Sequence, residues 1–269
     1  MKKQFIDCDV MPNGMQARGC LPRDDKCGSD WPVFEDQFDI YPREDWPELI
    51  EQNTSLREVV QRIYNQRQEG SCASNATCQA MEIAWRQTLG PAAYVAFSPI
   101  SIYRWVANGP NDGSVISHNL RQLRDVGALP LTDEASKASL QRMGLPQIHT
   151  LEHTGYYQSF PDGWKTTAGY FQCVEWYDIE SFDGIISALL DDFPVVYGRS
   201  GHAICGVAPY QDGRTFGIEY ANSWGDWGDN GYGRDTESKI SRAVKSYGAW
   251  ALRAVKITDE SLLLTGANL

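Results

Sequence analysis

The sequence predicts an α+β protein in which helices come first along the chain and an antiparallel, β-rich half follows. Apolar residues repeat with helical spacing between residue 46 and about residue 130. After about residue 165 the chain shows short runs of β-branched and aromatic residues between glycine-rich turns. Because helices and strands are segregated rather than alternating, we expect two lobes with a cleft between them.

The first half begins with an irregular extension over residues 1–45, where prolines and glycines interrupt every potential helix. Helices are then expected over residues 46–64, 72–89, 100–107 and 118–126. The second of these begins at Cys72 and is stopped by Gly90-Pro91. The third is opened by Ser98-Pro99, because serine caps a helix and proline suits its first turn.

The second half is expected to hold a helix over residues 182–190 and a loop over residues 223–233, which is rich in tryptophan and glycine. Strands are expected over residues 195–197, 203–207, 215–220 and 250–257. Residues 46–257 form the predicted domain, with a helical lobe over about 46–130 and a β-rich lobe over about 165–257. Residues 258–269 form a C-terminal tail, and the tail or the N-terminal extension could contact a partner in a protein assembly.

The charge balance excludes several classes of partner. The 269 residues include 35 acidic and 24 basic side chains, for a net charge of −11. Such a surface repels phosphate backbones and anionic lipid, so neither nucleic acid nor a membrane is an expected partner. No apolar run reaches the length of a membrane span, and the first ten residues, MKKQFIDCDV, do not read as a secretory signal. We therefore expect a cytoplasmic or virion-associated protein.

The seven cysteines are an odd number scattered over the whole length, unlike the dense pattern of a disulfide scaffold. We expect reduced thiols, although Cys20 and Cys27 are close enough in sequence to close a local loop. There is no Cys-x-x-Cys pair, and His149 and His153 lack a third ligand, so no metal site is predicted. Phosphate-cradling glycine motifs are absent, and no cofactor is expected.

Chemistry is predicted where a cysteine begins an alanine-rich helix. Unpaired backbone N–H groups and the helix dipole favour a thiolate there, so we expect a lowered pKa for Cys72. The alternative is that Cys72 only fills a helix contact. A nucleophile also needs a base, and His202, at the start of a predicted strand, is the candidate. Twenty residues after it comes the segment NSWGDWGDNGY, residues 222–232.

This segment resembles the C-terminal motif of the papain-like (C1-type) cysteine peptidases, in which asparagine is followed by Ser-Trp-Gly, a second Trp-Gly and an acidic-Asn-Gly-Tyr run. That family also has Asn-Gln just upstream of the nucleophile, with the glutamine six positions before it, as Asn65-Gln66 stands before Cys72. The order Gln, Cys, His, Asn matches as well. The resemblance covers roughly residues 46–257 and implies the two-lobed papain-like fold, with the active-site cleft between the lobes.

The resemblance implies a role for each matching residue. Cys72 would be the nucleophile of a cysteine endopeptidase, and His202 its base and later its general acid. Asn222 would hold the imidazole, and Trp224 would shield that hydrogen bond from water. Gln66 would donate to the oxyanion together with the Cys72 N–H. The backbone of a polypeptide substrate would pair with Gly113, Ser114 and Gly201.

Two other functions remain open. One is a papain-fold structural or binding component of a larger assembly, for example a viral one, with little or no turnover. The other is a different acyl-transfer enzyme with a Cys–His pair, such as a transglutaminase or amidase. The second is disfavoured because those folds usually orient the histidine with aspartate, whereas this motif supplies Asn222.

Some positions depart from the family pattern. Glu69 stands where the family usually has a disulfide cysteine, and Ala73 replaces the aromatic residue that commonly follows the nucleophile. Nothing resembles the long helical propeptide of lysosomal relatives. The extension 1–45 carries apolar anchors at Trp31, Phe34, Phe38 and Ile40. We expect it to run as a strap along the outside of the two lobes, with an inhibitory path through the cleft as the alternative.

Overall fold

The computed structural model describes residues 14, 17–24, 31–145 and 148–256. Six strands form one antiparallel sheet in the order β1-β6-β2-β3-β4-β5. They are β1 (Gln172–Asp178), β2 (Val195–Arg199), β3 (His202–Asp212), β4 (Thr215–Ala221), β5 (Tyr232–Thr236) and β6 (Ala249–Lys256). Helices precede most of this sheet along the chain, so the predicted α+β class is confirmed.

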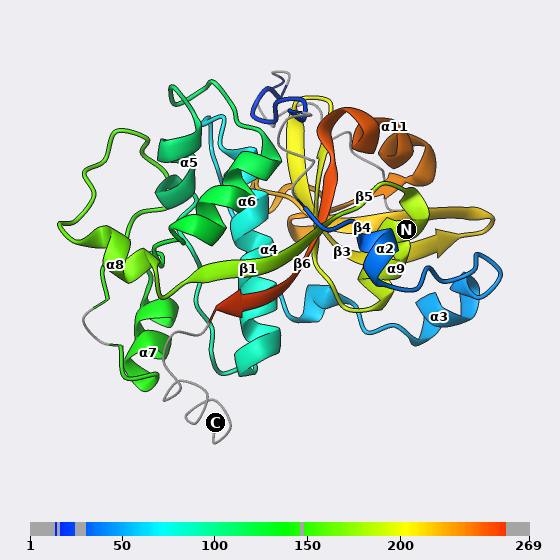
Figure 1. The fold of residues 1–269 in the computed structure, drawn as a ribbon, viewed down its shortest axis with the longest axis horizontal. Helices are drawn as coiled ribbons and strands as arrows, with labels where there is room; N and C mark the ends of the chain where they lie inside the picture. The colour runs from blue at the N-terminus through cyan, green and yellow to red at the C-terminus, as the bar shows by residue number, and fades with distance from the viewer. Residues whose placement is uncertain (1–13, 15–16, 25–30, 146–147, 257–269) are drawn as a thin grey trace.

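The helices lie on both sides of a central helix, α4 (Figure 1). On one side are α5 (Ile100–Val106), α6 (Ile116–Asp125), α7 (Glu134–Arg142) and α8 (Trp164–Ala168). Around the sheet lie α2 (Phe34–Gln37), α3 (Trp46–Gln52), α9 (Phe182–Leu190) and α11 (Glu237–Tyr247). The remaining short elements are a 3-10 turn, η1 (Leu56–Glu58), and α10 (Trp227–Asn230).

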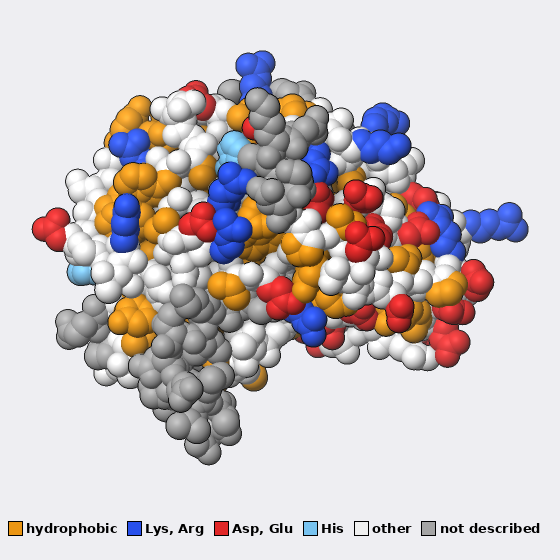
Figure 2. Space-filling model, viewed as in Figure 1, with side chains coloured by type: hydrophobic (Ala, Val, Ile, Leu, Met, Phe, Trp, Pro, Cys, Tyr) orange, Lys and Arg blue, Asp and Glu red, His pale blue; other side chains and the backbone are white. Residues whose placement is uncertain are grey.

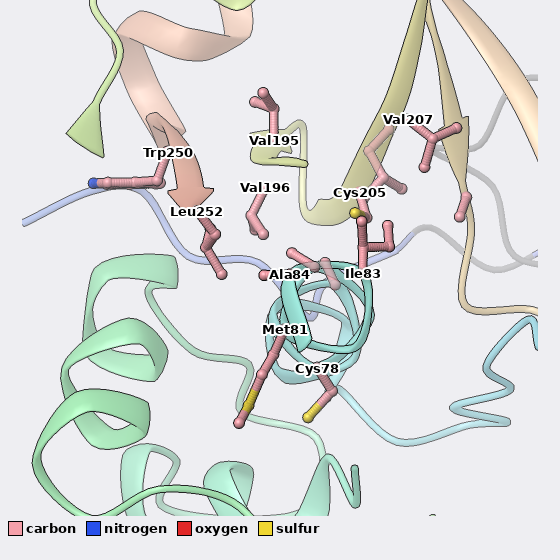
Figure 3. Close-up of a cluster of buried hydrophobic side chains, with 14 of the residues drawn as sticks. Cys78, Met81, Ile83, Ala84, Val195, Val196, Cys205, Val207, Trp250 and Leu252 are labelled. Carbon is pink, nitrogen blue, oxygen red and sulfur yellow. The ribbon is translucent and has the colours of Figure 1, made fainter. Parts of the chain in front are cut away.

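Helix α4 (Cys72–Leu89) forms the centre of the core, and sixteen of its 18 residues are buried. Its small alanine side chains let other elements approach closely, and it packs against β2, β3 and β6. Figure 3 shows Ile83 and Ala84 of this helix facing Val196 and Cys205 of the sheet. This packing fixes the N-terminal end of α4, and with it Cys72, between the helices and the sheet.

A carboxyl group is buried in this core. Glu82 of α4 is fully buried, and it accepts hydrogen bonds from the Gln61 N–H and the Gln79 side chain at 3.4 Å each. Burial raises the pKa of Glu82 to about 8, although the charges of Arg62 and Arg86 act in the opposite direction. The carboxyl is therefore protonated near neutral pH in the folded protein.

The predicted elements and the observed ones differ at several places. The helix expected over residues 46–64 ends at Gln52, because Asn53 is extended and Ser55 caps the separate turn η1. The expected loop 223–233 contains α10 and the first residues of β5. Strands β1 and β5 and helices α7, α8 and α11 were not predicted, and α2 forms inside the extension that was expected to hold no helix. The helices expected over residues 72–89 and 182–190 are confirmed as α4 and α9.

Residues 31–40 of the N-terminal extension lie against the outer part of the sheet lobe. Trp31 contacts Trp176 of β1 with ring centroids 4.6 Å apart, and Phe34 is fully buried. Arg43, a little further on, pairs with Asp183 of α9 and Glu237 of α11. Acidic side chains gather over α3 and α9 on the face shown in Figure 2. The tail 258–269 lies outside the described residues.

Candidate active site

Three of the four predicted catalytic residues lie at the ends of neighbouring elements. Cys72 is the first residue of α4, His202 is the first residue of β3, and Asn222 directly follows β4. Antiparallel pairing of β3 with β4 brings Cys205 opposite Ala221, which places His202 and Asn222 at the same edge of the sheet. Gln66 lies in the loop that leads into α4.

His202 is oriented by Asn222. Its Nε2 lies 2.8 Å from Asn222 Oδ1, and the indole of Trp224 stacks on the imidazole at 4.5 Å with an interplanar angle of 23°. Both polar residues are buried, and His202 Nδ1 has no hydrogen-bond partner among the described residues. Burial lowers the pKa of His202 to about 4, with a further lowering by the charge of Arg199, while the Asn222 hydrogen bond raises it. The imidazole is neutral and has one nitrogen available.

Cys72 lies against the same strand. Its side chain is fully buried and receives backbone hydrogen bonds from Ala203 and Ala73. Burial nevertheless raises the pKa of the Cys72 thiol to about 12. The lowered pKa expected from the helix N-terminus is therefore not found in this state, because the loss of hydration outweighs the backbone hydrogen bonds. Both the thiol and the imidazole are neutral here.

Gln66 is fixed at both ends of its amide. Its Oε1 accepts a hydrogen bond from Ser223 Oγ at 2.5 Å, and its Nε2 donates to Glu69 O at 2.7 Å. The Gln66 backbone N–H also donates to Ser223 O at 2.8 Å. Since a side-chain amide has two N–H groups, one of them is left for a further acceptor. Ser223 stands inside the motif 222–232, but sequence reasoning assigned it no role.

Residues 17–21 of the N-terminal extension lie between the two lobes and cover this site. They use the backbone of two predicted substrate-binding residues: the Cys20 N–H donates to Gly201 O, and the Leu21 N–H donates to Ser114 O, both at 3.0 Å. In return, the Ser114 N–H donates to Gly19 O at 3.0 Å. Cys20 and Ser114 thus form a short parallel bridge.

Gly19 is the residue that faces the thiol. A Cβ atom at this position would lie 2.6 Å from Cys72 Sγ and 2.7 Å from Gly70 O, so only glycine allows the chain to approach this closely. Gly113, the third predicted substrate-binding residue, has φ +72° and lies against the Arg18 and Gly19 carbonyls. The Gly19 carbonyl accepts its hydrogen bond from the Ser114 N–H and not from Gln66, so the Gly19 peptide bond is not held for attack.

The strap hypothesis is correct for only one part of the N-terminal extension. Residues 31–40 pack on the outside, as the strap hypothesis requires, whereas residues 17–21 pass through the cleft. The contact of residues 17–21 with the cleft comes from main-chain hydrogen bonds. Cys27, the suggested partner of Cys20, lies outside the described residues; Cys20, Cys72, Cys78 and Cys205 have free thiols.

The described residues contain no group of three or more side chains suited to a metal ion. His153, considered above as half of a pair, instead places its Nε2 2.8 Å from Asn75 Oδ1 of α4. Burial lowers the pKa of His153 to about 3. In the described part of the chain, no helix combines the length and the apolar character needed to cross a bilayer.

No protein-family model matches this sequence, and no curated protein is similar to it by sequence. Solved structures do match. Digestive procathepsin L 3 from the larval midgut of Tenebrio molitor superimposes with a TM-score of 0.62 at 14% identity, over 88% of this chain and 76% of that one. Xylellain, a cysteine protease from Xylella fastidiosa, gives 0.58 at 16% identity, over 94% and 97%.

Procathepsin B S9 from Trypanosoma congolense also gives a TM-score of 0.58, at 13% identity, over 88% of this chain and 87% of that one. At sequence identities of 13–16%, the structural similarity establishes the fold alone. The chain has the fold of the papain-like cysteine proteases.

Proposed function

We propose that this protein is a cysteine endopeptidase that hydrolyses peptide bonds through Cys72 and His202. The observation that carries the proposal is the 2.8 Å contact between His202 Nε2 and Asn222 Oδ1, which leaves His202 Nδ1 without a hydrogen-bond partner among the described residues. The Cys72 thiol lies against the next residue of the same strand, because it accepts a hydrogen bond from the Ala203 N–H. An imidazole held in this way by an amide is arranged to accept a proton from a nucleophile. The use of Asn222 rather than an aspartate also argues against the transglutaminase or amidase alternative.

The residues of the site supply each step of the reaction. When a substrate is bound, Cys72 transfers its proton to His202, and the thiolate attacks the peptide carbonyl. The carbonyl oxygen becomes an oxyanion, to which Gln66 Nε2 and the Cys72 backbone N–H would donate. His202 then protonates the departing amine, which leaves an acyl-enzyme. Finally, His202 takes a proton from water, and the hydroxide releases the acid and regenerates the thiol.

The contacts of residues 17–21 support a polypeptide as the substrate. Ser114 and Gly201 hold this segment through main-chain hydrogen bonds, which any extended peptide can make. A substrate must first displace the segment, because Gly19 occupies the space above Cys72 Sγ. The proposed enzyme is therefore latent in the state described here, and its activity depends on the departure of residues 17–21.

A substitution at Gly19 tests the proposal. Gly19→Val adds side-chain atoms where a Cβ atom would already lie 2.6 Å from Cys72 Sγ, so the segment should leave the cleft. We expect cleavage of a fluorogenic peptide library by Gly19→Val, little cleavage by the parent chain, and none by Gly19→Val with Cys72→Ala. Arg18→Ala is the matched control, because Arg18 is exposed.

Circular dichroism and thermal unfolding would show whether the Gly19→Val variant stays folded, and deletion of residues 1–24 provides a second way to open the site. A folded, open variant that alkylates at Cys72 but cleaves no peptide would contradict the peptidase proposal. It would favour the alternative of a papain-fold binding or structural component.

A further inference from the structure

The loop that carries the oxyanion donor is held at three points. At its start, the Gln66 N–H donates to Ser223 O at 2.8 Å. At its end, the Gly70 N–H donates to Pro110 O, also at 2.8 Å. The third point is the side chain of Glu69, which lies between them and three residues before Cys72.

The Glu69 carboxylate binds the turn at Gly155 and Tyr156, which is distant in the sequence. Its Oε1 accepts hydrogen bonds from the Gly155 N–H at 2.8 Å and the Tyr156 N–H at 2.9 Å. Glu69 Oε2 is buried and has no partner among the described residues. Glu69 Oε1 therefore accepts both hydrogen bonds from the main chain of the turn.

The turn that Glu69 binds is itself attached to the helical lobe. The Tyr156 hydroxyl donates to Ala107 O at 2.8 Å, just after α5. Its ring also contacts the ring of Tyr103 in α5, with centroids 5.6 Å apart in an edge-to-face arrangement. The backbone N–H groups that bind Glu69 are therefore held in place by contacts with α5 and do not belong to an isolated loop.

Glu69 also contacts Gln66 through its main chain, because Glu69 O accepts the hydrogen bond from Gln66 Nε2 at 2.7 Å. The side chain of Glu69 fixes the position of this carbonyl, and the carbonyl fixes one of the two N–H groups of the Gln66 amide. With Ser223 holding the amide oxygen, the second N–H has one direction left.

We propose that Glu69 is a positioning residue that aligns Gln66 for the oxyanion. This inference rests on the proposed peptidase function. The role requires an acceptor oxygen and not a negative charge, since the two partners of Glu69 are neutral backbone N–H groups. That distinction separates positioning from any electrostatic effect of Glu69 on Cys72 or His202.

Two variants and a control test the proposal in the Gly19→Val background, where the site is open. In Glu69→Ala, kcat should fall about tenfold with KM changed by less than about twofold, because Gln66 acts only on the transition state. In Glu69→Gln, the amide oxygen can accept both N–H groups, and kcat should stay within about threefold of the parent. Glu152→Ala, an exposed acid in the same region, should leave both constants unchanged.

A double substitution gives a readout that loss of stability alone would not produce. If Glu69 acts through Gln66, adding Glu69→Ala to Gln66→Ala should cost almost nothing further in kcat. Additive losses would overturn the proposal, and so would a loss in Glu69→Gln as large as in Glu69→Ala. A rise in KM with unchanged kcat would overturn it as well.

Hydrogen exchange tests the contact without any need for turnover. The Gly155 and Tyr156 amides should exchange faster in Glu69→Ala than in the parent or in Glu69→Gln. Equal exchange in all three would overturn the contact and the proposal with it. If exchange responds as expected but the open parent cleaves no peptide, it is the peptidase function that fails, and the catalytic role of Glu69 fails with it.

Discussion

Arg23 and Asp178 tie the residues that leave the cleft to the sheet lobe. Arg23 Nη2 lies 2.5 Å from Asp178 Oδ2 at the end of β1, and the Asp178 side chain is only 6% exposed. The Arg23 N–H also donates to Ser246 O in α11 at 2.9 Å, and its guanidinium lies 5.6 Å from the ring centre of Trp250. This anchor lies two residues beyond the segment 17–21.

Breaking the anchor should open the cleft more often. Arg23→Ala removes a charge-assisted contact worth about 1.5–3 kcal/mol, so alkylation of Cys72 in the intact chain should become about 10- to 150-fold faster. Peptide mass spectrometry after brief exposure to iodoacetamide would measure the rate. Arg43→Ala is the control, because the Arg43 ion pairs are on the outside of the molecule. Equal rates in the two variants would show that the anchor does not hold the segment.

The reactivity of Cys72 should depend on pH in a way that reports the state of the cleft. With residues 17–21 in place, burial raises the pKa of Cys72 to about 12, so alkylation of the parent chain should be slow at pH 6 and increase towards high pH. In Gly19→Val, water can reach the thiol and His202 Nδ1 can take its proton, so a thiolate–imidazolium ion pair can form and labelling should remain fast at pH 6. Adding His202→Ala should remove that fast labelling. Fast labelling that survives this change would exclude the ion pair.

Ser223 should contribute to catalysis through Gln66. Gln66→Ala in the open background should lose about 2–4 kcal/mol of transition-state stabilisation, the usual cost of one oxyanion donor. Ser223→Ala removes the 2.5 Å hydrogen bond to the Gln66 amide oxygen but leaves the backbone contact, so a smaller loss, about 1 kcal/mol, is expected. Steady-state kinetics would compare kcat/KM for the two. A loss in Ser223→Ala equal to that in Gln66→Ala would mean that Ser223 has another role.

Glu82 should make the protein less stable as the pH rises. The unfolded carboxyl ionises above about 4.5, whereas burial keeps it protonated to a pKa of about 8 in the fold, so unfolding releases a proton between these values. Each pH unit in this window costs about 1.4 kcal/mol. Relative to the parent, Glu82→Gln should therefore gain about 2.5 kcal/mol in free energy of unfolding between pH 5 and pH 7, as measured by urea titration. A pH-independent difference would show that Glu82 is ionised in the folded state.

The sequence could predict the parts of the molecule that have strong local signals. Helix α4 was predictable because its alanines lie on one face and Gly90-Pro91 ends it. The pairing of His202 with Asn222 was accessible only through a motif, since no spacing rule brings positions twenty apart into contact. The helix predicted through residue 64 was wrong because Asn53 and Ser55 prefer caps and turns to helix interiors, and periodicity alone ignores this.

The remaining parts depend on contacts between distant residues. The side chain of Glu69 shows its role only when the turn at Gly155 is folded against it. The path of residues 17–21 was equally hidden, because the segment binds through main-chain groups that every sequence possesses. The one specific feature of this segment is the glycine at position 19. Its importance could be recognised only once the structure placed it against Cys72 Sγ. The lowered pKa expected for Cys72 failed for the same reason, since the cover that buries the thiol was unknown.

The segment that covers Cys72 is part of the same chain, and this has a consequence for how it competes with substrates. A short tether gives such a ligand an effective concentration of about 1 mM, so even an intrinsic Kd of about 0.1 mM would keep the cleft closed about nine-tenths of the time. The segment is joined through the chain to Trp31, which contacts Trp176 of the sheet lobe. One cut of the chain between the segment and Trp31 would convert an intramolecular ligand into a separate peptide, which dilution would remove. Opening would then be irreversible, although every contact that closes the cleft is reversible.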